Sequence, residues 1–357
     1  MTQNLGSFNQ TRRAFLQTSA LGTTVMATGL SSPVLAQSKP KELLISAGGG
    51  DLLSSFQTAY YDDFTKETGI KISPQPWKGL AELKVIVESK SWGQADVMLM
   101  TSGEAASAQA LGLSEPLDYG SIDRASLLSG AYSDNWFLIN LAATLPAWNT
   151  DAVKSADVPK GWTDIFGSER KGPRGLFKNA SLTLDIAALG AGIPLDKLYP
   201  LDIDAALEAM SAIRNDIVWW NTGAQSQQLL ANGEVDTSMM WVNRVELLRA
   251  SGKPVDYNFN QAILDGDTLV IPKGHPNKKA AMEFAAYMAR PEPQARLVEL
   301  IPLGPTNTEA VKIASPAAMA KTASDPKNFP LTRIQDFQWW AENSQRASDA
   351  FTKWLLG

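Results

Sequence analysis

The stretch Leu43-Leu44-Ile45-Ser46-Ala47-Gly48-Gly49-Gly50 decides the fold class, because a short apolar strand runs directly into a glycine-rich turn. Apolar side chains then recur at steps of three and four from Leu53 to Phe64, which predicts a helix that ends at Gly69. A further strand, helix and strand are predicted at Ile70–Ile72, Leu80–Glu88 and Asp96–Met100. This alternation predicts an α/β unit with right-handed crossovers.

The same alternation returns later in the chain. A strand, a helix and a second strand are predicted at Asp216–Trp220, Gly223–Ala231 and Val235–Trp241. Thr268–Pro272 is another apolar strand. Lys278–Ala289 is predicted as a helix that Asn277 is placed to cap and that Pro291 stops. We find no repeat of short period, which argues against a solenoid.

The composition narrows the classes of function. The chain has 357 residues, of which 44% are hydrophobic. It is longer than a single hydrophobic core usually supports, which predicts two lobes. It contains no cysteine and a single histidine, His275, so disulfides, thiolate metal sites and cysteine nucleophiles are excluded, and we expect no cofactor and no metal. We expect His275 in a surface turn, a poor place for a catalytic base. The formal net charge of -5 argues against nucleic acid or an anionic membrane as the partner.

Residues 1–36 have the pattern of a cleavable export signal. Arg12-Arg13 precedes an apolar but threonine- and serine-rich run that closes at Val34-Leu35-Ala36. The twin arginine followed by Phe15-Leu16 resembles a bacterial twin-arginine signal, and an ordinary secretory signal is the alternative. Either route predicts cleavage near Ala36 and a periplasmic protein without a lipid anchor.

Several segments, in the same order along the chain, resemble the extracellular solute-binding proteins of ABC importers, in particular the spermidine/putrescine-binding group. The segments that carry the resemblance are Phe64–Lys71, Ala95–Val97, Trp148–Val153, Gly233–Val235 leading to Trp241, Asp267–Pro272, Asn277–Met288 and Gly304–Asn307. Each is a weak motif alone, whereas the ordered set covers nearly all of the chain after the leader.

The resemblance implies a two-lobed periplasmic-binding-protein fold of type II, in which each lobe is a mainly parallel sheet flanked by helices. Ligand would be trapped between the lobes by hinge closure, close to the carboxyl ends of the strands. We place the first lobe at residues 41–143 plus 266–310, and the second at residues 144–265 plus 311–357.

Two residues lead the expected ligand site. Asp267 aligns with an acidic ligand residue of the spermidine binders, and a carboxylate there suits an alkyl ammonium; the alternative is a local turn cap. Trp241 matches a family tryptophan that stacks on the ligand, and a core position is the alternative. Trp220 and its neighbour Trp219 must point to opposite faces of their strand, so one of them is a further candidate. Trp136 is another.

The remaining candidates weaken a polyamine assignment. Asp185 falls where the family carries a polyamine-binding acid, but the family's second acid is Ala188 here. Glu104 occupies a loop where polyamine binders place aromatic residues; it could compensate for the missing acid, or be a solvated glutamate at a helix start.

Two features favour an anion or a zwitterion. Gly49 and its glycine neighbours offer free backbone N–H groups ahead of a helix, although a tight turn explains them equally well. Arg244, three residues past Trp241, could clamp a carboxylate, or be a surface helix residue.

We therefore expect a solute-binding protein that captures a small amine, polyamine-like or zwitterionic in the manner of an amino-acid derivative, aminobutyrate or opine, and delivers it to a membrane permease. We expect it to be a monomer. An exported enzyme is the remote alternative, because no hydrolase, zinc-protease, phosphate-loop or dinucleotide motif is present.

Overall fold

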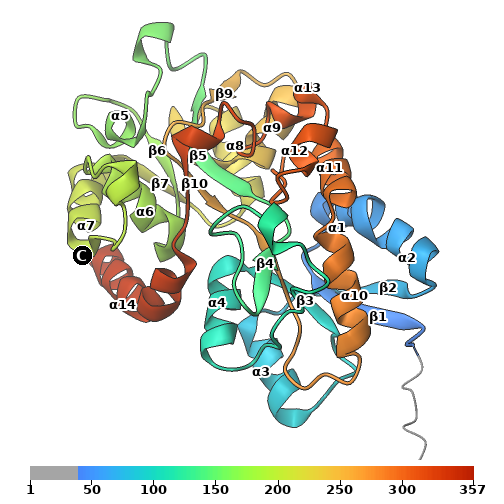
Figure 1. The fold of residues 1–357 in the computed structure, drawn as a ribbon. Coiled ribbons are helices and arrows are strands. Elements are labelled where there is room, and N and C mark those ends of the chain that lie inside the picture. Colours follow the sequence, from blue (N-terminus) through green and yellow to red (C-terminus); the bar gives the residue numbers. More distant parts are fainter. Residues whose placement is uncertain (1–38) are drawn as a thin grey trace, which may run out of the picture. The chain divides into compact units, whose positions relative to one another are not determined.

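Two β-sheets organise the chain in the computed structural model, which describes residues 39–357. The predicted leader at residues 1–36 and its cleavage position lie outside the described residues. Mixed α/β architecture with helices on the sheets is as the sequence predicts (Figure 1).

The first sheet has five strands in the order β2-β1-β3-β11-β4. Its strands are β1 (Glu42–Ala47), β2 (Lys71–Pro76), β3 (Val97–Thr101), β4 (Trp136–Leu138) and β11 (Asp267–Val270). β1 is parallel to β2 and β3, whereas β11 runs antiparallel to both β3 and β4. The prediction of a mainly parallel sheet therefore holds for β1–β3 and not for β11, because β11 enters the sheet from the other half of the molecule.

Strand β3 shows why its apolar run is continuous. Val97 and Leu99 belong to a core cluster with helices α1, α2, α10 and α11, whereas Met98 and Met100 belong to a second cluster with α3 and α4. Alternate side chains of one strand therefore serve the two faces of the sheet. The helices are α1 (Asp51–Phe56), α2 (Asp62–Thr68), α3 (Leu80–Ser89), α4 (Ser102–Ala110), α10 (Lys278–Met288) and α11 (Pro291–Leu300).

The second sheet has seven strands, with the path β12-β10-β5-β8-β6-β7 and with β9 paired to β5. Its strands are β5 (Ala142–Asn149), β6 (Arg174–Phe177), β7 (Ile217–Trp220), β8 (Thr237–Trp241), β9 (Val255–Tyr257), β10 (Ala262–Asp265) and β12 (Thr332–Ile334). β6, β7 and β8 are parallel, and β5 runs antiparallel to β8.

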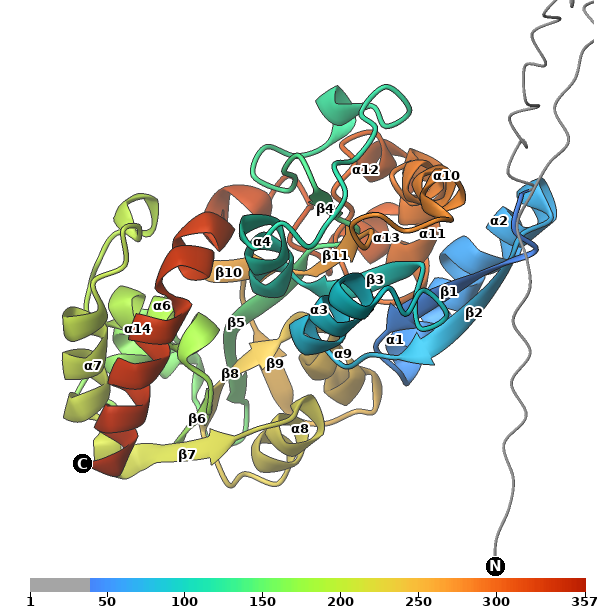
Figure 2. The same cartoon turned by 90° about the horizontal axis from the view of Figure 1, so that it is seen from below.

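Helices around the second sheet come from the middle and the end of the chain. They are α5 (Trp162–Phe166), α6 (Ala180–Gly190), α7 (Ile203–Ala212), α8 (Gly223–Ala231), α9 (Val242–Ala250) and α14 (Phe337–Leu356). Figures 1 and 2 show α14 beside α6 and α7, with α4 of the first sheet on its other side. The short helices α12 (Ala310–Ile313) and α13 (Pro316–Met319) pack against α11, so the chain stays with the first sheet beyond residue 310.

The chain crosses between the two sheets at two adjacent points. β4 leads to β5 through residues 139–141, and β10 leads to β11 through Gly266 alone. The backbone N–H of Ile139 donates to the Asp267 carbonyl at 2.8 Å, and a Cβ on Gly266 would lie 2.1 Å from the Asn140 carbonyl oxygen. The two crossings are therefore packed backbone to backbone, and glycine is required at residue 266.

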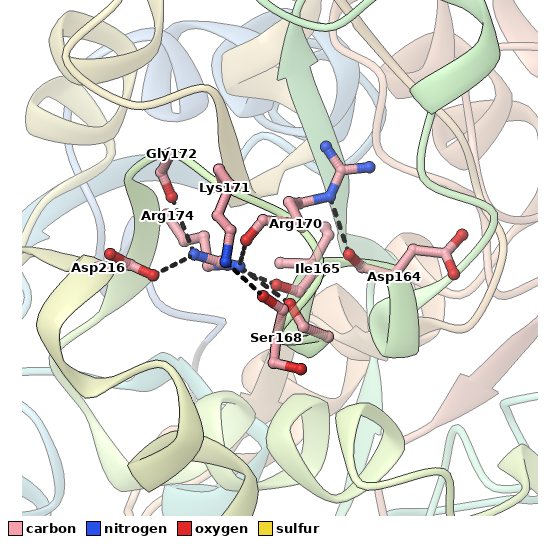
Figure 3. Close-up of polar contacts among 9 residues, drawn as sticks. Asp164, Ile165, Ser168, Arg170, Lys171, Gly172, Arg174 and Asp216 are labelled. Atoms are coloured by element: carbon pink, nitrogen blue, oxygen red, sulfur yellow. Dashed lines mark hydrogen bonds and ion pairs between the residues drawn. The ribbon is translucent and has the colours of Figure 1, made fainter.

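Arg174 holds a loop at the amino end of β6 (Figure 3). Its guanidinium is 1% exposed and donates to the backbone carbonyls of residues 165, 167, 170 and 172. It also pairs with Asp216 at 2.8 Å. Every donor direction of this buried cation is used within the fold.

Two local predictions are wrong. His275 is buried at 2% exposure, because its ring packs edge-to-face on Trp92 and Nδ1 lies 3.5 Å from Asp96. Asn277 precedes α10 but makes no capping bond with its side chain; instead its amide donates to Asp96 at 2.8 Å. In addition, the first predicted helix is divided, with a π-helical turn at Gln57–Tyr61 between α1 and α2, and it ends at Gly69 as predicted.

Candidate functional site

Strand β5 brings the functional ends of both sheets together at the crossings. Ala142 pairs with Asp265 on one side of β5, and Thr144 pairs with Trp241 on the other. In the first sheet, Asp267 pairs with Thr101 at the carboxyl end of β3. The carboxyl ends of the parallel strands of both sheets therefore meet at the crossings, the position at which open α/β sheets bind ligands.

An aromatic cluster ends the second sheet here. Phe177 closes β6 and stacks on Trp220, which closes β7, with ring centroids 4.6 Å apart. Trp241, at the end of β8, meets both rings edge-on at 5.6 and 5.4 Å. Trp241 is half-buried, whereas Trp220 is fully buried. The structure thus corrects the expectation for Trp220. This side chain packs edge-to-face against Trp241 and has no exposed surface for a ligand.

Arg244 lies one turn into α9, beside Trp241. A Cβ on Gly223, the first residue of α8, would lie 2.6 Å from Arg244 Nε and 3.0 Å from the Trp241 ring, so the arginine stem fits into a notch that only glycine leaves open. Arg244 is half-buried, and its buried Nε makes no hydrogen bond within residues 39–357. The same part of the chain contains no acidic partner for Arg244, in contrast to the paired Arg174 and Arg249. This guanidinium therefore retains donors for an anion.

Two carboxylates stand at the second crossing. Asp267 accepts a 2.8 Å hydrogen bond from the Asn140 amide, and burial raises its pKa. Burial, and then the neighbouring Asp267 charge, raise the pKa of Asp265 to about 7. Neither carboxylate has an ion-pair partner in residues 39–357. A cation placed between them would relieve their mutual repulsion and return both pKa values toward the ordinary range.

Asp185 does not lie open to this site. The carboxylate is fully buried in α6 and accepts hydrogen bonds from Tyr199 at 2.8 Å, Gln335 at 2.6 Å and Trp340 at 3.2 Å. Burial raises its pKa to about 6, and these donors oppose that rise. These side chains satisfy both carboxylate oxygens of Asp185 inside the fold. The expectation of a ligand contact at Asp185 is thereby corrected.

Glu104 is committed to the backbone of the first sheet. Its Oε1 accepts from the Leu80 N–H at 3.1 Å, and its Oε2 accepts from the Thr101 hydroxyl at 2.8 Å. It forms a capping box at the start of α4 with Thr101 and also holds the start of α3. The structure therefore places Glu104 at a helix start, as the alternative predicts, with its carboxylate bonded to Leu80 and Thr101 and not left free for a ligand.

The glycine turn after β1 is open but not suited to an anion. Nothing lies within 4 Å of a Cβ placed on Gly49, and Gly50 has a φ of 69°, which favours glycine. However, α1 has six residues and begins with Asp51, which places a negative charge at the same helix start. Gly49 thus leaves room for close approach of a ligand, whereas the free cationic donors lie at Arg244.

Trp136 lies apart from Trp241. It begins β4, is buried, and packs edge-to-face on Phe337 at 5.7 Å. Both rings line a cavity of about 790 Å³ between α4 and the start of α14. The structure does not bring Trp136 together with the other candidates.

Asp265 and Phe177 also lie at this site and were not predicted from the sequence. The signal for Asp265 was present, because the crossing Leu264-Asp265-Gly266-Asp267 carries two carboxylates. Phe177 required the knowledge that β6 is the central neighbour of β7 and β8. Within residues 39–357, no group of three metal-ligating side chains gathers, and no helix is long and apolar enough to cross a membrane.

Known proteins of one family are similar to this chain over most of its length. Residues 59–330 match the profile of the family described as bacterial extracellular solute-binding protein. The gamma-aminobutyric acid-binding protein of Pseudomonas aeruginosa is 27% identical over 336 residues, covering 91% of this chain and 94% of that protein. The spermidine/putrescine-binding periplasmic protein of Escherichia coli is 24% identical over 289 residues, covering 78% and 81%.

Solved structures give the same result. A GABA receptor structure aligns with a TM-score of 0.81 and 31% identity, over 88% of this chain and 97% of that one. The binding protein AgtB from A. tumefaciens R10, in complex with agropinic acid, aligns with a TM-score of 0.75 and 28% identity, over 88% and 99%.

Proposed function

We propose that this chain, which belongs to the bacterial extracellular solute-binding proteins, captures a small zwitterion with a carboxylate at one end and an amine at the other. As a member of that family it is a solute-binding component of an ABC transporter, and its relatives are binding proteins. We further propose that it is exported, cleaved near Ala36 and active as a monomer that delivers its ligand to a permease.

The observation that carries the proposal is a pair of opposite charges without ion-pair partners in the part of the chain that the structure describes. Arg244 supplies the positive charge after β8. Asp265 and Asp267 supply the negative charge at the crossing. β5 pairs both with β8, which leads to Arg244, and with β10, which ends at Asp265. A ligand with one charge of each sign would complete both ends at once.

The carboxylate end fits Arg244, because guanidinium binds carboxylate through two parallel N–H groups. The notch at Gly223 and the ring of Trp241 hold the arginine stem, so less side-chain freedom is lost on binding. Trp241 supplies an apolar face beside this cation for the ligand's methylenes.

The amine end fits the two carboxylates. Asp267 is oriented by Asn140, and an ammonium would replace the hydration that burial removes from these groups. A diamine has no use for Arg244, which would repel its second ammonium. The relatives that bind gamma-aminobutyric acid and agropinic acid support the zwitterion over the polyamine.

We propose capture by hinge closure about the two crossings, whose short linkers are residues 139–141 and Gly266. The ligand would bridge the sheets and shift the population toward the closed form, which the permease then binds. We assign no catalytic step, because His275, the single histidine, is buried among Trp92 and Asp96, away from the crossings.

The experiment compares four compounds of matched length by isothermal titration calorimetry: 4-aminobutyrate, butyrate, butylamine and putrescine, together with a panel of opine-like amino-acid derivatives. We expect a zwitterion to bind and to raise the melting temperature. The one-ended compounds should bind at least about tenfold more weakly, since each lacks one charged pair. Putrescine binding more tightly than every zwitterion would overturn the proposal in favour of a polyamine.

A further inference from the structure

Trp77 is an aromatic side chain left uncovered at the same edge of the first sheet. It follows β2, whose last residue, Pro76, pairs with Ala47 at the end of β1. The side chain is 42% exposed, and it is the one aromatic among the large apolar side chains that are exposed in residues 39–357. A single exposed apolar side chain is ordinary, so what distinguishes Trp77 is its position at the carboxyl ends of the parallel strands, where α/β sheets bind ligands.

Hydrogen bonds fix the backbone around Trp77 and therefore define where its side chain leaves the chain. The Trp77 N–H donates to the Ala47 carbonyl at 3.1 Å. Leu80 is held by Glu104, as described above, and Gly79 between them has a φ of 79°. The indole lies over Gly79, at 3.7 Å from the position of a Cβ there. Glu104 thereby positions Trp77 through this segment.

The surroundings leave the ring free on its outer side. The neighbouring turn at the end of β1 carries no side chains at Gly49 and Gly50, and nothing lies within 4 Å of a Cβ on either. The turns after β1 and β3 are occupied by glycines and Glu104, so neither offers an aromatic ring. Trp77 is the residue of the first sheet that can provide one at this edge.

We infer that Trp77 is the aromatic wall of the ligand site on the first sheet, covering the ligand's methylenes and its ammonium from the side opposite Trp241. The inference rests on the proposed function and adds a specificity-determining residue to it. Indole faces attract ammonium groups and bury methylenes, and closure of the hinge would bury the exposed ring in the same step.

The test measures 4-aminobutyrate, or the tightest zwitterion of the panel, against Trp77→Phe, Trp77→Gln and Trp77→Ala by calorimetry. We expect affinity to fall in the order Trp, Phe, Gln, Ala, with about a tenfold loss or more for Ala and less than about threefold for Phe. Ligand-induced quenching of tryptophan fluorescence should shrink in Trp77→Phe. Val85→Ala, which truncates another exposed side chain on α3, is the control and should leave affinity unchanged.

The outcomes separate this inference from the function on which it rests. If the wild type binds a zwitterion and Arg244→Ala lowers that affinity by about 30-fold or more, while all three Trp77 variants bind as the wild type does, the aromatic wall is wrong and the function stands. If the wild type binds no zwitterion, the proposed function itself fails. Trp77→Phe keeps an aromatic ring and Trp77→Gln keeps a long side chain, so the order of affinities remains measurable even if Trp77→Ala melts early.

Discussion

Arg174 and Arg244 are two partly or fully buried cations at opposite ends of the same parallel strands. Arg174 begins β6, and its guanidinium donates to four backbone carbonyls and to Asp216, as Figure 3 shows. Arg244 follows β8, and its buried Nε has no hydrogen-bond acceptor within residues 39–357. Within the described residues, all donors of Arg174 thus have acceptors, whereas the Nε of Arg244 has none.

The difference follows from where each side chain lies in the fold. At the amino end of the strands the loop 165–172 is fixed by Arg174, so the charge stabilises structure. At the carboxyl end, where α/β sheets bind ligands, a buried donor without a partner lowers the stability of the empty protein, and a bound anion can restore the missing hydrogen bonds. For Arg244, the unpartnered Nε and the position at the carboxyl ends of the strands together point to a bound anion.

The largest expected effect comes from removing the satisfied cation. Arg174→Ala should lower the free energy of unfolding by about 3–5 kcal/mol, because several buried carbonyls and Asp216 lose their donor. Ligand affinity, measured well below the melting temperature, should be unchanged. Arg346→Ala on the exposed face of α14 is the control, for which we expect a change within about 0.5 kcal/mol in urea unfolding.

Arg244→Ala should give the opposite pattern. We expect the affinity for a zwitterion to fall by about 2–4 kcal/mol, or between about 30-fold and 1,000-fold, because the carboxylate loses its charged donors. Stability should change little, since the fold makes no use of the buried Nε. Calorimetric titration and a thermal melt of the same variant test both parts, and a destabilised variant with unchanged affinity would remove the contrast between the two arginines.

Periodicity in the sequence predicted the elements that carry this contrast. Gly223–Ala231 is a helix with the predicted bounds, and the apolar run before Thr101 is a strand buried on both faces. These features are local, because the spacing of apolar side chains records the period of the element and the number of faces it buries. The arrangement of the chain as two sheets joined by crossing segments was predicted from the family resemblance and not from periodicity.

The partners of individual polar residues could not be predicted, because they are distant in sequence. Asp185 is satisfied by Gln335 and Trp340, about 150 residues later along the chain. His275 is buried by Trp92 and Asp96, which lie about 180 residues earlier in the chain, although its glycine and proline neighbours indicate a turn. Whether a charged residue is free or used depends on such tertiary contacts, which spacing does not record.

Asp267 and Asp185 extend the contrast to carboxylates. Asp267→Asn should weaken a zwitterion by about 1.5–3 kcal/mol, the value of a charged hydrogen bond, with little loss of stability. Asp185→Asn should leave affinity unchanged and lower the free energy of unfolding by about 1–3 kcal/mol, because an amide cannot accept from all three donors. Equal effects of the two substitutions on affinity would show that Asp185, despite its burial, belongs to the site.

The smallest expected effect concerns the pH dependence of the open site. The pKa of Asp265 is raised to about 7, so the folded protein holds a proton there that the unfolded chain loses near the ordinary aspartate pKa. This contribution to stability is fully present below the unfolded value and is lost as pH rises through about 7. Asp265→Asn should therefore match the wild type near pH 4 and melt at a higher temperature near pH 8.

The pKa of Asp185 is raised in the same direction, to about 6. The informative quantity is therefore the difference in melting temperature between the wild type and Asp265→Asn at each pH. Ligand binding gives the complementary readout. An ammonium needs the deprotonated carboxylates, so wild-type affinity should decline as pH falls below about 7, and binding should release a proton that calorimetry in two buffers of different ionisation enthalpy detects. A melting difference that does not change with pH, together with no proton release, would mean that Asp265 is charged in the empty protein and that the crossing is satisfied as fully as the Arg174 loop.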